Sequence, residues 1–120
     1  MEIVEVLKAL ADETRVRILN LLYKETLCVC DLEEILKLSQ SNASRHLTKL
    51  KNAKLITGDK QAQWVYYRVD EKTLEQHSFV KELLEQGLDK SHQCQKDVAR
   101  LRKYRDCGGN CEHNVKISDE

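Results

Sequence analysis

Two pairs of closely spaced cysteines are the side chains in this 120-residue sequence that are best suited to do chemistry. One residue separates Cys28 from Cys30, and three residues separate Cys107 from Cys111. Thiolates are the soft ligands that thiophilic ions select. Residues i and i+2 of a regular helix point roughly 200° apart, so Cys28 and Cys30 could share one ion only if the backbone between them bends. The spacing therefore predicts a thiol site whose occupation changes the local backbone.

The setting of these cysteines favours free thiols over structural disulfides. Residues 1–5 lack the basic start and the long apolar run of a secretory signal. No apolar run approaches the roughly 18 residues that a membrane span requires. We therefore expect a cytoplasmic protein with no membrane partner, whose five cysteines stay reduced and act as ligands or sensors.

A basic block interrupts a chain whose net charge is zero. Residues 35–69 carry seven positive charges and one negative charge, a net charge of +6, so the rest of the chain carries a net charge of −6. Such a block on a neutral protein indicates a local face that binds a polyanion. The alternative interpretation is an ordinary solvated helix surface.

Short helices are expected to position the cysteines and the basic block. Asp12 has the side chain of an N-cap for a second helix. A third helix should begin near Cys30 and Asp31, where the helix dipole lowers the pKa of a thiol. An apolar stripe at i, i+4 and i+7 (residues 43, 47 and 50) predicts a fourth helix that starts near residues 39–41 and ends before Leu55.

A β-hairpin is predicted after the fourth helix. Residues 55–57 and 63–69 are rich in β-branched and aromatic side chains, and residues 58–61 between them have the composition of a turn. Helices before and after this hairpin complete the pattern. The predicted fold class is mainly α with a small β-hairpin, arranged as a winged helix-turn-helix.

The last third is predicted to be helical up to Gly108 and Gly109, which should end the final helix. We expect one winged helix-turn-helix and dimerisation domain over residues 1–106 and a polar, mobile, cysteine-containing tail over residues 107–120. The outer helices carry more apolar stripes than a small core is expected to cover, which makes them candidates for a homodimer interface.

Four motifs lie in a fixed order in the first 70 residues. They are ALADETR at 9–15, LCVCDL at 27–32, SQSNASRHL at 39–47 and WVYYR at 64–68. Together they resemble the ArsR/SmtB family of metalloregulators, most closely its arsenical-resistance repressors. The resemblance implies a homodimeric winged-helix repressor that binds an inverted-repeat operator in double-stranded DNA and releases it when As(III) or Sb(III) binds cysteine thiolates.

The resemblance also assigns the residues that would contact DNA. Arg can pair with guanine and Gln with adenine in the major groove, whereas Lys binds phosphate without reading sequence. For His46, packing inside the protein and contact with the DNA backbone are both open. The expected base readers are Gln40, Ser41, Ser44 and Arg45, and the expected phosphate contacts are Lys49, Lys51, Lys60 and Arg68.

The ligand set of the inducer is incomplete in the sequence motif. A trivalent arsenic centre binds three thiolates, and the motif offers Cys28 and Cys30; Glu33 stands where some relatives carry another cysteine. The third thiolate could come from Cys94, Cys107 or Cys111, or from a cellular thiol. Cys107 and Cys111 could instead form a second site.

Two other signals and one other class of function compete with this interpretation. The same cysteines could sense Cd(II), Pb(II) or Zn(II), or Cys28 or Cys30 could form a disulfide with a distant cysteine in a thiol-redox repressor. An enzyme is not expected, because the sequence has no phosphate loop, no Cys-x-x-Cys on a βαβ pattern and no base beside a nucleophile.

Overall fold

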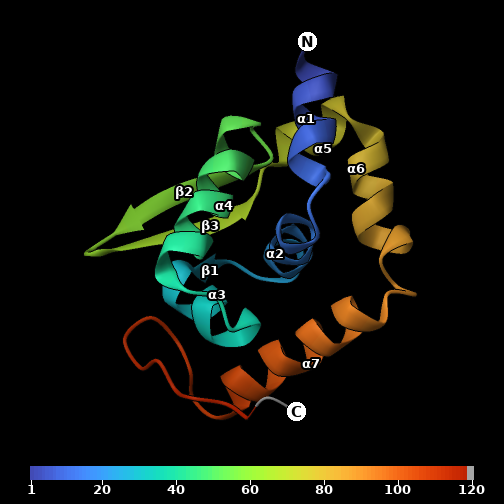
Figure 1. The fold of residues 1–120 in the computed structure, drawn as a ribbon. Helices are drawn as coiled ribbons and strands as arrows, with labels where there is room; N and C mark the ends of the chain where they lie inside the picture. The colour runs from blue at the N-terminus through green and yellow to red at the C-terminus, as the bar shows by residue number, and fades with distance from the viewer. Residues whose placement is uncertain (119–120) are drawn as a thin grey trace.

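The computed structural model describes residues 1–118 as helices around a small antiparallel sheet (Figure 1). No helix in this described part of the chain is both long enough and apolar enough to cross a membrane. In chain order the elements are α1 (Glu2–Leu10), α2 (Glu13–Lys24), β1 (Leu27–Cys28), α3 (Val29–Leu36), α4 (Gln40–Asn52), β2 (Ile56–Gln61), β3 (Trp64–Val69), α5 (Glu71–Gln76), α6 (Ser78–Glu82), the π-helical turn η1 (Leu83–Gly87) and α7 (His92–Asp106).

Oxygen acceptors on short side chains determine where the helices begin. Asp12 Oδ1 accepts the backbone N–H of Arg15 at 3.1 Å, and Ser39 Oγ accepts that of Asn42 at 3.2 Å. Each bond satisfies an N–H that has no partner within its own helix. The predicted N-cap at Asp12 and the predicted start of the fourth helix are confirmed.

The sheet has three strands, one more than the predicted hairpin. β3 lies between β1 and β2 and pairs antiparallel with both. β1 places Leu27 opposite Tyr67 and Cys28 opposite Tyr66. A strand of two residues shows no alternation of polar and apolar side chains, so β1 could not be predicted from the sequence pattern. Because of this strand, the two cysteines of the motif lie on different elements: Cys28 is in β1 and Cys30 is in α3.

The predicted turn over residues 58–61 is wrong, because these residues continue β2. The chain turns instead at Ala62, which has a φ of 56°. At position 58 of this strand a side chain would not fit: a Cβ there would lie 2.9 Å from Cε1 of Tyr67 on the neighbouring strand. A glycine inside a strand thus marks a close cross-strand approach here rather than a turn.

The core gathers around α2, which lies at the centre of the molecule (Figure 1). Ile18, Leu19 and Leu21 on this helix are fully buried. Three residues, 37–39, separate α3 from α4, and the hairpin β2–β3 follows α4. A helix, a short turn, a second helix and a hairpin form a winged helix-turn-helix, which confirms the predicted fold class.

The C-terminal segment departs from its prediction as a mobile tail. Its described residues, 107–118, return along α7 and pack against α3 (Figure 1). Cys111 and Ile117 are 7% and 6% exposed, and Ile117 belongs to the hydrophobic core. The helix does end where Gly108 predicts, since this residue has a φ of +85°. Apolar burial and hydrogen bonds to α3 and α7 together dock this short polar segment.

Candidate functional site

Two cysteines from opposite ends of the chain meet beside the start of α3. Cys28, at the end of β1, and Cys111, in the tail, form a disulfide with a Cα–Cα distance of 6.4 Å. Ligand atoms of Cys28, Cys111 and Asp31 all lie within 4.8 Å of one another, and all three residues are buried. The expectation that all five cysteines are reduced is therefore wrong for Cys28 and Cys111. This cluster, called the thiol site below, combines one carboxylate with two sulfur atoms, which become thiolate ligands when the disulfide is reduced.

The carboxylate of Asp31 organises the first turn of α3. Its Oδ2 accepts the backbone N–H of Cys28 at 3.0 Å, and its Oδ1 accepts the hydroxyl of Tyr104 at 2.7 Å. Arg105 approaches Oδ2 at 3.9 Å. The buried charge is therefore hydrogen-bonded and lies beside a cation, which offsets the cost of its burial. These bonds fix the backbone of Cys28 and join α3 to α7.

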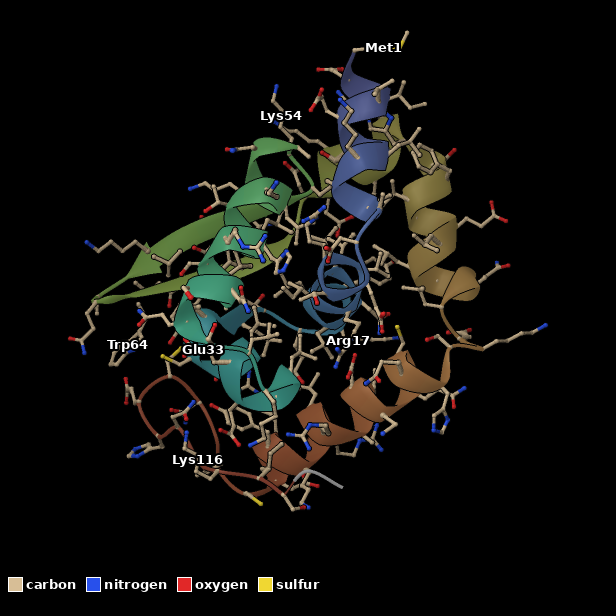
Figure 2. The ribbon with its side chains drawn as sticks, in the orientation of Figure 1. Met1, Arg17, Glu33, Lys54, Trp64 and Lys116 are labelled. Atoms are coloured by element: carbon tan, nitrogen blue, oxygen red, sulfur yellow. A yellow bond between two sulfur atoms is a disulfide. The ribbon has the colours of Figure 1, made fainter. Side chains whose placement is uncertain are left out.

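Cys30 lies in the first turn of α3 and carries a free thiol of intermediate exposure. Burial raises the pKa of this thiol, and the negative charges of Glu33 and Asp31 raise it further. The expectation of a lowered pKa is therefore wrong: two neighbouring carboxylates and desolvation outweigh the backbone N–H groups of the helix start. Figure 2 shows Glu33 on the side of α3 that faces the tail loop.

The structure distinguishes between the alternatives that the sequence left open for the other cysteines. Cys107 is exposed and free, whereas Cys111 is buried against Cys28, so the sequence pair Cys107–Cys111 is not brought together at one cluster among residues 1–118. Cys94 is free and buried in α7. Of the three candidates for a further sulfur ligand, Cys111 is the one next to the motif.

Asp31 and Tyr104 belong to the site, although the sequence motifs do not indicate a role for either. An Asp three residues after the residue that starts a helix is the pattern of a capping box, which could have indicated its bond to Cys28. Nothing local could have indicated the Tyr104 contact, since it joins residues 73 positions apart.

The basic face is exposed along α4 and the hairpin. Of the residues assigned to DNA contacts, all but His46 are exposed, and they lie on α4, β2 and β3. The apolar stripe of α4 is buried, and its polar stripe faces solvent. Arg68 and Asp59 lie 3.5 Å apart on the hairpin. The exposed set is Gln40, Ser41, Ser44, Arg45, Lys49, Lys51, Lys60 and Arg68.

His46 is inside the protein. It is 5% exposed, and its Nδ1 lies 3.2 Å from a guanidinium nitrogen of Arg15. Arginine can only donate, so Nδ1 accepts and the imidazole is neutral with its proton on Nε2. Burial lowers the pKa of His46 by more than the charge of Asp12 raises it, and the charges of Arg45, Arg15 and Lys49 lower it further. Of the two open roles, the structure supports packing rather than contact with DNA.

Comparison with known proteins agrees with this geometry. Residues 12–57 match the model of the arsR family of bacterial regulatory proteins. The chain is 48% identical over 65 residues to the arsenic resistance transcriptional regulator ArsR1 of Pseudomonas putida; this match covers 53% of the chain and 51% of that protein, so the chain spans about half of its length.

Two further similarities extend over more of the chain. The homodimeric winged helix-turn-helix DNA-binding domain of Mb0332 from Mycobacterium bovis, described as a possible ArsR-family regulator, superposes with a TM-score of 0.61 at 26% identity, covering 76% of this chain and 85% of that one. The arsenic resistance transcriptional regulator ArsR2 of Pseudomonas putida is 39% identical over 103 residues, which cover 85% of this chain and 87% of ArsR2. With this fold and this identity over most of both sequences, the chain belongs to the ArsR family of bacterial regulatory proteins.

Proposed function

We propose that the chain is a homodimeric transcriptional repressor that binds an inverted-repeat operator and releases it when Cys28, Cys30 and Cys111 bind As(III) or Sb(III). The observation that carries the proposal is the contact between Cys111 of the tail and Cys28 of the sensor motif. It supplies the sulfur ligand that the motif lacks.

The proposed DNA surface is the exposed stripe of α4 together with the hairpin. A helix with a buried apolar stripe and an exposed polar stripe can enter a major groove, and its Gln and Arg side chains have the donors that read base edges. Lysines beside them would contact phosphate and give affinity independent of sequence. In a two-fold dimer the two copies of α4 would occupy successive major grooves, which is why the operator should be an inverted repeat.

The proposed dimer surface includes α1. Ile3 is 42% exposed and Leu7 is 50% exposed on this helix, and Val4 beside them is 37% exposed. Apolar side chains on consecutive turns of one helix form a face that water does not favour. A second copy of the chain is the occupant that an inverted-repeat operator requires, so we assign this face to the homodimer.

The donors of the thiol site fit a thiophilic inducer. Cys28 and Cys111 already lie together, and Cys30 is in the same first turn of α3. Soft thiolates select soft ions, so the three sulfurs suit a trivalent metalloid better than the oxygen of Asp31 does. When bound, the inducer would supply a link between three sulfur atoms. Cys30 lies outside the group of mutually close ligand atoms among residues 1–118, so its thiol has to move toward the other two.

Movement of Cys30 would change the position of the elements that form the proposed DNA surface. Cys28 is extended, with a φ of −94°, whereas Cys30 is helical, so the two side chains leave the backbone in different directions. Bringing Cys30 to Cys28 therefore distorts the first turn of α3. Only residues 37–39 separate α3 from α4, and β1 pairs with β3 of the hairpin. Both proposed DNA-contacting elements are thus attached to the segment that moves.

A binding titration tests this function. The reduced protein is bound to a fluorescent duplex taken from the region upstream of its own gene, and release is followed by anisotropy as arsenite is added. We expect release of the unaltered protein and strongly reduced release of Cys28→Ser and Cys30→Ser, with DNA affinity in the absence of arsenite retained. Normal release of both variants would place the inducer site elsewhere. Parallel titrations with antimonite, Cd(II), Pb(II) and Zn(II) distinguish the inducers.

The Cys28–Cys111 disulfide favours a second candidate signal, thiol oxidation. Loss of two electrons and two protons from the two thiols would form the bond, and an oxidant such as a peroxide would accept them. The two candidates separate in one experiment. Release by peroxide that is reversed by dithiothreitol, without any response to arsenite, would favour the redox repressor.

A further inference from the structure

We propose that Glu34 is a positioning residue that holds the C-terminal tail on α3 and so presents Cys111 to Cys28. This inference deepens the proposed function, on which it rests for the purpose of the site. The tail segment concerned, residues 110–118, carries hydrogen bonds on both sides of Cys111.

The carboxylate of Glu34 is the centre of the anchor on the C-terminal side. It is 4% exposed, and its Oε2 accepts the backbone N–H of Ile117 at 2.8 Å. Lys37 Nζ lies 2.6 Å from the same oxygen, and Lys116 Nζ lies 3.3 Å from the other. Burial raises the pKa of Glu34, but these three donors outweigh it and hold the pKa below its ordinary value. The group is therefore a buried carboxylate that needs the tail as a partner.

Arg100 on α7 strengthens this anchor from the other side. Its Nε donates to the carbonyl of Ile35 at 2.6 Å, and a terminal nitrogen donates to the carbonyl of Glu34 at 3.3 Å. Its second terminal nitrogen donates to the carbonyl of Ser118. The side chain of Ile117 between these bonds is 6% exposed and packs in the core. Lys116 marks this part of the tail in Figure 2.

A second anchor lies between Cys111 and the Glu34 anchor. The Oδ1 of Asn110 accepts the backbone N–H groups of Glu112 and His113, both at 2.8 Å, which closes the loop around Cys111. Asn114 Nδ2 donates to the carbonyl of Cys30 at 3.0 Å and to the hydroxyl of Tyr104 at 3.2 Å. Cys111 therefore lies in a short loop that is tied to α3 on its C-terminal side, first at Asn114 and again at Ile117.

Anchoring of this kind determines the effective concentration of the Cys111 thiol at the Cys28 thiol. A thiol on a flexible linker reaches a second thiol with an effective concentration on the order of millimolar, and a linker held in the productive geometry exceeds that value. A hydrogen bond to a buried charge is strong enough that its loss changes an equilibrium by roughly tenfold or more. Weakening the Glu34 anchor should therefore weaken every reaction that joins Cys111 to Cys28.

Thiol–disulfide equilibrium measures this joining without any metalloid. In a buffer of reduced and oxidised glutathione, two glutathione thiols give up two electrons and two protons and become one glutathione disulfide. The protein disulfide accepts them and becomes the thiols of Cys28 and Cys111. Mass spectrometry after thiol alkylation gives the ratio of linked to free forms. The variants are Glu34→Gln and Ile117→Asp, and Glu112→Gln is the control that removes an exposed charge from the same tail.

We expect the linked fraction relative to the free form to fall roughly tenfold in Glu34→Gln and in Ile117→Asp, and to stay within about twofold in Glu112→Gln. DNA affinity of the reduced variants should be unchanged, which shows that they fold. If Glu34→Gln does not fold, Ile117→Asp tests the same anchor by a different side chain. An unchanged ratio in Glu34→Gln overturns the proposal, as does a shift confined to Ile117→Asp. The ratio could shift as expected while arsenite fails to release DNA from the unaltered protein. That result would support the role of Glu34 and contradict the proposal that arsenite is the inducer.

Discussion

The hydroxyl of Tyr104 on α7 donates to Asp31 Oδ1 on α3 over 2.7 Å, although 73 positions separate the two residues. Tyr104 is fully buried, and burial together with the charge of Asp31 raises the pKa of its hydroxyl. The same carboxylate holds the backbone of Cys28. One hydrogen bond thus links the C-terminal helix to the segment that carries the sensor cysteine.

Removing this hydroxyl should destabilise the protein. Tyr104→Phe leaves a buried carboxylate oxygen without its donor, and we expect the free energy of unfolding to fall by roughly 1–3 kcal/mol. Urea denaturation of the reduced protein measures the change. Tyr66→Phe is the control, since its hydroxyl has no hydrogen-bond partner in residues 1–118, and it should change stability by less than about 0.5 kcal/mol. Equal effects of the two substitutions would contradict the role given to the Tyr104–Asp31 bond.

A buried ion pair attaches α7 to α2. Asp97 is fully buried and accepts two bonds from Arg17, at 2.9 and 3.0 Å, and one from Gln93. Asp97→Ala leaves Arg17 without its partner, so stability should fall by about 3 kcal/mol. Thermal or urea unfolding checks this, and Asp106→Ala at the exposed end of the same helix should have almost no effect. A small loss for Asp97→Ala would show that Arg17 finds water or another partner.

The neutral state of His46 predicts a dependence of stability on pH. Its pKa in the folded protein lies below the ordinary value of 6.5, so the unfolded chain binds the proton more readily. The stability that this group contributes is present above pH 6.5 and is lost as the pH falls through 6.5 toward the lower, folded value. Urea midpoints between pH 5 and 8 measure the loss, which His46→Gln should reduce and the exposed-tail control His113→Gln should leave intact. A slope unaffected by His46→Gln would contradict this account.

Two substitutions on α4 should weaken DNA binding in different ways. Arg45→Ala removes a proposed base contact and should cost about 1–3 kcal/mol while relaxing specificity at one position of the operator. Lys49→Ala removes a proposed phosphate contact, so affinity should fall for all sequences and the salt slope should decrease by about one. Titrations of operator and unrelated duplexes at several salt concentrations separate the two. The same loss on both duplexes for Arg45→Ala would mean that it reads no base.

The sequence predicted the fold class well because its strongest signals are local. The apolar stripe of α4, the capping residue Asp12 and the glycine that ends α7 each act within a few residues of chain, and each prediction is confirmed. The turn of the hairpin was predicted at the wrong residues because Gly58 is needed for its close approach to Tyr67. Composition alone cannot distinguish such a glycine from a glycine in a turn. β1 was not predicted because a strand of two residues is too short to show an alternation of polar and apolar side chains.

The candidate site was only half predictable, because its other half comes from 83 residues away. Spacing identified Cys28 and Cys30 but left open whether Cys94, Cys107 or Cys111 joins them and whether Cys107 and Cys111 form a second site. The docking of the tail depends on Glu34, Arg100 and Ile117, whose contacts form only in the folded chain. The pKa of Cys30 was predicted in the wrong direction, because the carboxylates of the same turn oppose the helix dipole.

The most direct test of the account compares two cysteines of the tail that differ in where the fold places them. Cys111 is buried at Cys28, and Cys107 is exposed and free. Arsenite is titrated into the DNA complexes of reduced Cys111→Ser and Cys107→Ser, and the half-release concentrations are compared with that of the unaltered protein. The account predicts a large increase for Cys111→Ser and no change for Cys107→Ser. Release of the Cys111→Ser complex at the unaltered concentration would contradict it.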